Sequence, residues 1–320
     1  MFLIMLSRLS HYVRRLLSSD KAPSTTSSAG EVLLNRAVIV NVSQGLANQM
    51  ISYKAGRMIA ELNNAPLILD NRFFKSLETN SSRNYQLHRF PIQADLSIFC
   101  EAAMAKIFRD NKVARPGEEG YPEKYAREIP DAFRLNEERR VIYFGFWDAL
   151  HLRELADRFF RENGLLKELT LDREIHLASP DRKLLAVIEK SRNPVAVHVR
   201  RGDYATHDGG LLIKSDYYNK SIRTLEDRVE EPEFFVFSDD QDWCRSHITS
   251  SESLHFADWN TDSTGYRDLY LASRCRHFIL SNESTFSHLI VQLSAELPDR
   301  IVITSTKDDL ERMSGSNGTK

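Results

Sequence analysis

The chain has little of what would assign it to several familiar classes of protein. It has three cysteines, Cys100, Cys244 and Cys275, which lie far apart. No two of them have the spacing of metal ligands, which argues against a disulfide framework or a zinc cluster. The formal net charge is only -2 at pH 7, so there is no overall basic field to hold a nucleic-acid backbone. We therefore expect no nucleic-acid partner.

Long apolar runs are also lacking. The apolar run 1–6 ends before Arg8; it is too short for a transmembrane helix and lacks a small-residue cleavage site. Apolar residues then recur roughly on one helical face beside basic ones. This pattern predicts a peripheral contact of residues 1–17 with an anionic membrane surface, and a frayed terminus is the alternative. We expect a cytoplasmic location, with the cytoplasmic face of the membrane as the second possibility.

The composition that remains is that of a soluble globular protein. With 320 residues, 42% hydrophobic and 28% charged, the chain can hold two domains of ordinary size. A Ser/Thr/Ala-rich stretch, 18–30, precedes the first regular pattern. The expected organisation is an N-terminal amphipathic segment and flexible linker (1–35), a first α/β domain (36–180), a second (181–305) and a polar tail (306–320).

Apolar periodicity alternates between the strand and the helix type along most of the chain. It predicts strands at 38–42, 66–70, 141–146, 195–199, 233–237, 254–256, 277–280 and 301–303, helices at 46–62, 215–229, 265–275 and 284–295, and a mostly helical stretch at 148–190. Residues 71–140 up to the third strand show no clear order. Strand–helix alternation of this length predicts doubly wound parallel sheets, whose ligands bind outside the carboxyl ends of the strands.

Residues 195–204, VAVHVRRGDY, are the most informative part of the sequence. The valines alternate as the buried face of a strand does, and His198 and Arg200 share the opposite face. Adjacent guanidiniums of Arg200 and Arg201 at the end of an apolar strand favour a bound anion. A diphosphate fits, because arginine binds phosphate with two parallel hydrogen bonds and keeps its charge. The alternative is two solvated arginines, paired to Asp203.

Three other predicted strands also end in polar segments, at 43–49, 238–240 and 281–286. In the last, Ser284 and Thr285 open a helix, where hydroxyls and backbone N–H groups either bind phosphate or simply cap the helix.

Two further patterns are weaker. Gly45 at a strand–helix turn, with Asp70 after the next strand, resembles a nicotinamide-cofactor site, but one glycine stands where that fingerprint has three. Asp240 and Asp242 are spaced as metal-binding carboxylates can be, yet the first turn of a helix favours acidic residues without any metal.

Five blocks, taken together, resemble the family-11 glycosyltransferases, the bacterial and animal alpha-1,2-fucosyltransferases. Residues 44–50, QGLANQM, with 55–57, AGR, are similar to the family's opening motif, and 198–204 match its His-x-Arg-Arg-Gly-Asp-Tyr motif. The remaining blocks, at 234–240, 268–273 and 281–287, follow in the family's order, so that the resemblance spans about residues 38–293.

The resemblance implies an α/β, GT-B-like fold with two facing Rossmann-like domains and parallel sheets. Residues 36–180 would form the acceptor side and 181–305 the GDP-sugar-binding domain. It implies an inverting transfer of L-fucose from GDP-fucose to a glycan hydroxyl, in an alpha-1,2 linkage, for surface polysaccharide or glycan synthesis, with no required cofactor or metal. The alternatives are a catalytically silent nucleotide-sugar- or glycan-binding relative and a transferase that uses another GDP-sugar.

The resemblance also implies roles for individual residues. Arg200 and Arg201 would neutralise the leaving diphosphate, His198 would orient the donor, and Asp203 would orient an arginine or act as the base. The implied GDP-fucose-binding residues are Gly45, Asn48, Gln49, His198, Arg200, Arg201, Asp239, Asp268, Ser284, Thr285 and Phe286.

This sequence also departs from the family's motifs at several positions. Gln44 and Ala47 stand where the opening motif has glycine, Glu283 is an extra residue, and His288-Leu289 replace a usual tryptophan pair. The last change concerns the acceptor, since stacked aromatic rings commonly bind sugars.

Overall fold

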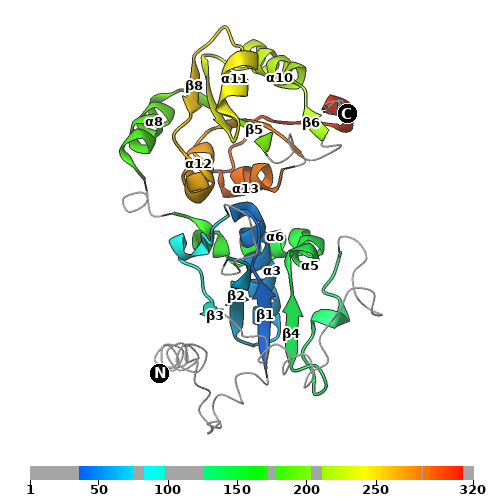
Figure 1. Ribbon diagram of the computed structural model, residues 1–320. Coiled ribbons are helices and arrows are strands. Elements are labelled where there is room, and N and C mark those ends of the chain that lie inside the picture. The colour runs from blue at the N-terminus through cyan, green and yellow to red at the C-terminus, as the bar shows by residue number, and fades with distance from the viewer. Residues whose placement is uncertain are drawn as a thin grey trace, which may run out of the picture. The chain divides into compact units, whose positions relative to one another are not determined.

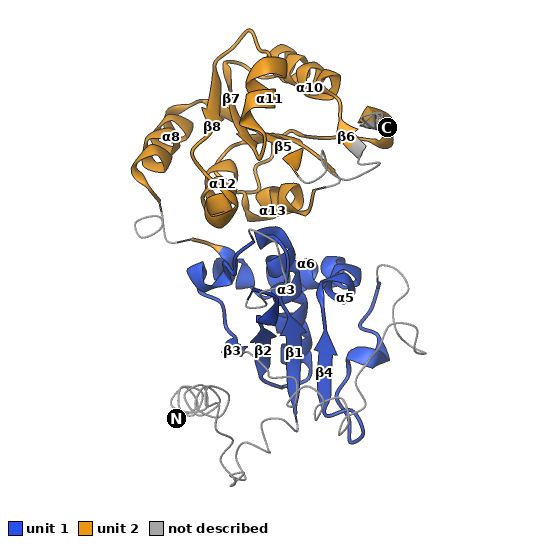
Figure 2. Cartoon of the chain, viewed as in Figure 1, with its two compact units in different colours: residues 1–169 blue, residues 170–320 orange. Residues whose placement is uncertain are grey.

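The chain folds into two compact units, Met1–Leu169 and Thr170–Lys320, each with its own sheet. A computed structural model (Figure 1) describes residues 36–74, 83–97, 126–171, 177–202, 211–282 and 284–312. Figure 2 colours the two units separately. Helix α8 (Ser179–Lys190) belongs to the second unit as a whole.

The first unit is built on a four-stranded parallel sheet in the order β3-β2-β1-β4. Its strands are β1 (Ala37–Asn41), β2 (Leu67–Asp70), β3 (Asp95–Ser97) and β4 (Val141–Phe144). The three predicted strands are confirmed to within two residues at each end; β3 was missed, because its sequence, Asp-Leu-Ser, carries no apolar pattern. β1, β2 and β4 are mainly apolar and nearly all buried, as expected for parallel strands that are covered on both faces.

Helix α3 (Leu46–Leu62), predicted over the same residues, connects β1 to β2 and packs closely on the sheet. A Cβ at Gly56 would lie 2.5 Å from Val40 Cγ2 and 2.9 Å from Leu67 Cδ1, so only glycine permits this approach. The other helices of this unit are α5 (Phe146–His151) and α6 (Arg153–Glu162), with the short turns η1 (Arg72–Phe74), η2 (Leu87–Arg89), η3 (Asp131–Phe133) and η4 (Leu165–Leu169).

The second unit contains a five-stranded parallel sheet in the order β10-β9-β5-β7-β8. Its strands are β5 (Asn193–Val199), β7 (Pro232–Ser238), β8 (Leu254–Ala257), β9 (His277–Leu280) and β10 (Val302–Thr304). Its further helices are α10 (Ser215–Arg228), α11 (Gln241–His247), α12 (Gly265–Ala272) and α13 (Thr285–Leu293), with the turns η5 (Asp262–Thr264) and η6 (Lys307–Asp309). All five predicted strands of this unit are confirmed.

Helices cover both faces of this sheet: α10 and α11 lie on one side, α12 and α13 on the other (Figure 1). The valines of β5 pack against apolar side chains of α10, as their alternation predicts. A separate antiparallel pair joins β6 (Leu211–Ile213) to β11 (Leu310–Arg312), so that part of the segment 306–320 is a strand.

In each sheet the order of the strands reverses beside the strand that comes first in the chain. In the first unit this point lies between β1 and β4, and in the second between β5 and β9. Open parallel sheets bind their ligands outside the carboxyl ends of the strands at such a point. The fold therefore directs attention to the residues that follow β1, β4, β5 and β9.

Three expectations concern the rest of the chain. In the described ranges, no helix combines the length and the apolar character needed to cross a membrane. Residues 1–17, for which a membrane contact was predicted, lie outside those ranges, as does Cys100. Cys244 and Cys275 are buried free thiols, as expected.

Candidate functional site

The two arginines that follow β5 are each held by a carboxylate. Arg200 Nη1 lies 2.7 Å from Asp239 Oδ2, and the Arg200 side chain is 23% exposed. Arg201 Nε lies 3.3 Å from Asp240 Oδ2, and its side chain is 10% exposed. The Arg201 guanidinium also stacks 3.9 Å from the ring centre of Trp243. The arginines are therefore fixed in direction and differ in burial.

The partners of the arginines come from the end of β7. Parallel pairing places Val199 beside Ser238, so the residues that follow the two strands meet. Asp239 Oδ1 also accepts a hydrogen bond of 2.8 Å from the backbone N–H of Arg201, and Asp240 is the N-cap of α11. Asp203, for which pairing to an arginine was predicted, lies outside the described residues.

Gly202 is required by this arrangement. A Cβ at Gly202 would lie 2.5 Å from Asp239 Oδ2, and the carboxylate would have to move off the arginines. The glycine of the motif therefore permits the close approach of the Asp239 carboxylate.

Arg201 keeps an unused hydrogen-bonding group. Its Nη1 is buried and has no hydrogen-bond partner among the described residues. A buried charged donor without a partner destabilises a protein by about 1–3 kcal/mol or more. A bound anion would satisfy it, and phosphate oxygens match the guanidinium geometry. The end of β5 is therefore prepared for an anion even though both arginines already have carboxylate partners.

His198 connects β5 to the start of α13 at the same edge of the sheet. Its Nδ1 lies 2.8 Å from Ser287 Oγ, and its ring stacks on Phe286 with centroids 5.0 Å apart. Burial lowers the pKa of His198 to about 4, and the nearby charge of Arg200 acts in the same direction. The imidazole is therefore neutral at pH 7 and offers one N–H donor and one acceptor.

The turn from β9 into α13 carries the predicted serine and threonine. Ser284 is the N-cap of α13, but its hydroxyl makes no capping hydrogen bond. The alternative that this side chain simply caps the helix is therefore not supported. Ser284 is 6% exposed. Thr285 begins the helix, whose first backbone N–H groups form a favourable place for an anion. Because β9 and β5 are neighbours, this turn and the arginine pair lie at one edge of one sheet.

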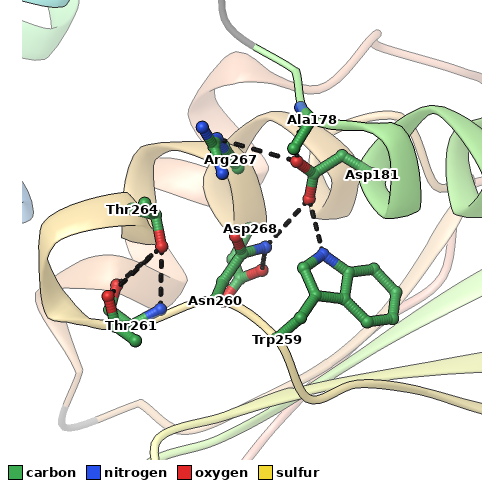
Figure 3. Close-up of polar contacts among 8 residues, drawn as sticks. All are labelled: Ala178, Asp181, Trp259, Asn260, Thr261, Thr264, Arg267 and Asp268. Atoms are coloured by element: carbon green, nitrogen blue, oxygen red, sulfur yellow. Dashed lines mark hydrogen bonds and ion pairs between the residues drawn. The ribbon is translucent and has the colours of Figure 1, made fainter.

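Asp268 belongs to a second polar cluster in the same unit, shown in Figure 3. Asn260 Nδ2 donates to Asp268 Oδ1 at 2.6 Å and to Asp181 Oδ1 at 3.1 Å. The fully buried Asp181 also accepts from Trp259 Nε1 at 2.8 Å and lies 3.6 Å from Arg267 Nε. Burial, together with the charge of Asp181, raises the pKa of Asp268 to about 7.

The surroundings of Asp268 disfavour its ionised form, and pKa values shifted in this way are common at functional sites. Sequence reasoning found Asp268 through its motif but missed Asp181, Trp259 and Asn260. The one local signal was the position of Asp181 in the first turn of α8, where it accepts from the backbone N–H of Ala178 at 2.8 Å.

The predicted residues of the first unit lie at the start of α3. Gly45 is the N-cap, and Asn48 Nδ2 donates to Gln44 Oε1 at 2.5 Å. Gln44 has a φ of 65°, a region that favours glycine and that other residues enter at a cost. Glycine, which the family motif has at this position, would adopt this conformation freely, whereas Gln44 adopts it at a cost in backbone strain.

Gln49 has a structural role that the motif did not reveal. It is fully buried; its Nε2 donates to the carbonyl of Asn84 at 2.9 Å, and its Oε1 accepts from the backbone N–H of Gln86 at 2.9 Å. It fixes residues 84–86 against α3.

The positions of the missing tryptophan pair are also resolved. Leu289 is 1% exposed and lies in the core, whereas His288 is exposed and lies 3.2 Å from the Asn282 carbonyl through Nε2. In this chain the second of these positions therefore supports packing and does not present a ring to a sugar.

Two α/β units with parallel sheets, one of which has an arginine pair at its switch point, are the architecture of a GT-B glycosyltransferase, as predicted. The sequence model of Glycosyl transferase family 11 matches residues 35–317. The chain belongs to this family, and the resemblance drawn from the five blocks is confirmed.

Curated relatives carry related names. The chain is 28% identical to an alpha-1,2-colitosyltransferase of Escherichia coli, over 77% of this chain and 84% of that one. It is 26% identical to the O-antigen biosynthesis glycosyltransferase WbnK of Escherichia coli, over 83% and 93%. It is 31% identical to human galactoside alpha-(1,2)-fucosyltransferase 1, over 41% and 36%.

Solved structures share the fold. The NodZ alpha-1,6-fucosyltransferase co-crystallized with GDP has a TM-score of 0.53 at 15% identity, covering 87% of this chain and 98% of that one. The fucosyltransferase NodZ from Bradyrhizobium, in another structure, has a TM-score of 0.51 at 14% identity, with the same coverage. These structures show the GT-B-like α/β fold, and membership of Glycosyl transferase family 11 makes the protein an enzyme of the glycosyltransferase class.

Proposed function

We propose that the enzyme transfers L-fucose from GDP-fucose to a hydroxyl of a glycan acceptor with inversion, forming an alpha-1,2 linkage in surface polysaccharide or glycan synthesis. The observation that carries the proposal is the oriented pair Arg200 and Arg201, with a buried guanidinium nitrogen of Arg201 lacking a partner among the described residues. The family and the names of the relatives support it. A transferase that uses another sugar nucleotide is the second candidate, favoured by the colitosyltransferase among the relatives.

The proposed reaction requires stabilisation of the leaving group. The bond from the anomeric carbon to the diphosphate oxygen breaks, the acceptor oxygen attaches to the same carbon, and its proton leaves to a base. Negative charge therefore develops on the diphosphate, where preorganised guanidiniums act most strongly. Asp239 and Asp240 hold the two guanidiniums in place before the charge appears. Asp203 stays a prediction, as base or as a further partner of the arginines.

The proposal also gives roles to predicted donor-binding residues of the second unit other than the arginines. Ser284, Thr285 and the backbone at Phe286 would contact the diphosphate or nucleoside through the open start of α13. Asp268 would accept hydrogen bonds from the guanine, whose N1–H and amino group present adjacent donors to one carboxylate. The neutral His198 would orient the donor through a hydrogen bond, because Ser287 and Phe286 fix its ring.

The decisive experiment measures GDP release from GDP-fucose over a panel of glycan acceptors. In Arg201→Ala we expect kcat to fall by about 10²- to 10³-fold, the usual effect of removing one such donor, with the circular dichroism spectrum retained. Arg201→Lys keeps the positive charge but not the planar guanidinium, so its kcat should lie between those of the wild type and Arg201→Ala. Arg245→Ala removes an exposed arginine of the same unit, paired to Asp258, and is the matched control.

The outcomes separate the alternatives. Full activity of Arg201→Ala would refute the role given to the pair. A melting temperature raised by GDP-fucose without GDP release on any acceptor would favour a silent binding protein. Turnover of GDP-mannose in preference to GDP-fucose would favour another donor.

A further inference from the structure

Trp147 is the most exposed of the large hydrophobic side chains in the described ranges. It is 68% exposed, whereas its neighbour Phe146 is 6% exposed and belongs to the core of the first unit. The two rings contact each other, with centroids 5.1 Å apart and planes at 59°. The indole therefore packs against Phe146 while most of its surface is exposed to solvent.

The position of Trp147 is that of a ligand-binding residue. It lies on α5, which starts directly after β4 and packs against α3 (Figure 1). The carboxyl ends of β1 and β4 flank the switch point of the first sheet, where parallel sheets bind ligands. An exposed indole contributes little to the stability of the core. A ligand that covers it therefore explains a tryptophan at this position better than folding does.

A polar cluster at the same edge supplies what a sugar needs besides an apolar surface. Asp70, at the end of β2, is fully buried and pairs with Arg72, whose Nη2 lies 2.8 Å from Asp70 Oδ2. The Tyr143 hydroxyl on β4 lies 3.4 Å from Arg72 Nη2. The Arg72 side chain is 32% exposed, so this polar cluster is partly accessible from solvent. Aromatic and polar groups in combination are typical of small-molecule sites.

We infer that Trp147 is the platform on which a pyranose ring of the acceptor glycan stacks. This inference rests on the proposed function, which requires a glycan acceptor, and adds where the first unit binds it. The C–H face of a pyranose matches the flat apolar surface of an indole, and its equatorial hydroxyls extend sideways toward hydrogen-bonding groups. Trp147 contributes to acceptor affinity and leaves donor affinity unchanged.

The test uses the full chain and Trp147→Ala, with Trp147→Phe as the conservative variant. Leu62→Ala is the matched control, because Leu62 is 52% exposed at the opposite end of α3. The chain has three tryptophans, so the indole N–H signal of Trp147 is assigned in ¹⁵N spectra by its loss in Trp147→Phe. Galactose, glucose, N-acetylgalactosamine and lactose are titrated in the presence of GDP, and the acceptor KM and the Kd of GDP-fucose are measured for each variant.

We expect a saturable shift of the Trp147 signal with at least one saccharide. Trp147→Ala should raise the KM, or the Kd of that saccharide, about tenfold, the scale of a lost aromatic contact. Trp147→Phe should stay within about threefold of the wild type, and Leu62→Ala should not differ from it. No shift with any of the four saccharides, or an unchanged acceptor constant in Trp147→Ala, overturns the inference. Failure of the wild type to bind GDP-fucose would instead overturn the proposed function.

Discussion

Replacing Asp268 by asparagine should stabilise the protein at neutral pH and weaken donor binding. Asp268 is partly buried and lies near the charge of Asp181, and loss of solvent around the carboxylate together with this charge raises the pKa of Asp268 from 3.8 to about 7. At about 1.4 kcal/mol per pH unit, the rise corresponds to about 4 kcal/mol of lost stability when the group is ionised. Asparagine has the same shape, carries no charge and still accepts from Asn260 Nδ2.

The sign of the pH dependence follows from the direction of the shift. Between pH 3.8 and about 7 the folded state keeps a proton on Asp268 that the unfolded state has released. The wild type therefore loses stability as pH rises through this window, and the loss is complete above it. The stability of Asp268→Asn relative to the wild type should be near zero at pH 4 and reach about 2–4 kcal/mol at pH 8, where part of the full value is offset by relaxation.

Thermal unfolding followed by tryptophan fluorescence reports on this cluster, because Trp259 is hydrogen-bonded to Asp181. We expect Asp268→Asn to melt about 5 °C or more above the wild type at pH 8. Asp258→Asn, which removes an exposed carboxylate from the same unit, controls for the change in net charge. A difference between Asp268→Asn and the wild type that is constant from pH 4 to pH 8 would refute the reasoning. Unchanged GDP affinity in Asp268→Asn would separately refute its role in donor binding.

The first unit allows two further predictions, both measured by urea unfolding. Gly56→Ala should lower the unfolding free energy by about 1–3 kcal/mol, because the new Cβ meets Val40 and Leu67 at under 3 Å; an unchanged midpoint would contradict the close packing of α3. Lys54 is 1% exposed and pairs with Asp157, whose side chain is 26% exposed. Lys54→Met should therefore change stability by only about 1 kcal/mol, whereas Asp157→Asn, which removes the charge of the carboxylate that faces a buried ammonium, should cost about 3 kcal/mol; the reverse order would show the argument to be wrong.

Local pattern was enough for the elements that form the two cores. The predicted strands of both units are present, and α3 has the bounds that its periodicity indicated. Three short strands were missed. β3, β6 and β11 have three residues each, and such segments owe their conformation largely to a partner strand. The equally short β10 was predicted, because Ile301, Val302 and Ile303 form an apolar run.

The arginine pair shows where sequence reasoning stops. Adjacent guanidiniums after an apolar strand indicated an anion site, and Asp203 was predicted to orient one of them or to act as the base; that stays a prediction, because Asp203 lies outside the described residues. The described partners are Asp239 and Asp240, which the parallel register of β5 and β7 places alongside. Which carboxylates meet the arginines is decided by the pairing of β5 with β7, two strands that are distant in the sequence.

The sequence by itself determined the family and the two α/β cores, and it supplied the residues of the candidate donor site, because motif order and apolar periodicity are local properties of the chain. The tertiary structure decided which groups face one another: the joint hold of Asn260 on Asp181 and Asp268, the stacking of His198 on Phe286, and the exposure of Trp147 at a sheet edge. Burial and contact depend on strand order, crossover and helix packing, which bring together residues that no spacing along the chain relates.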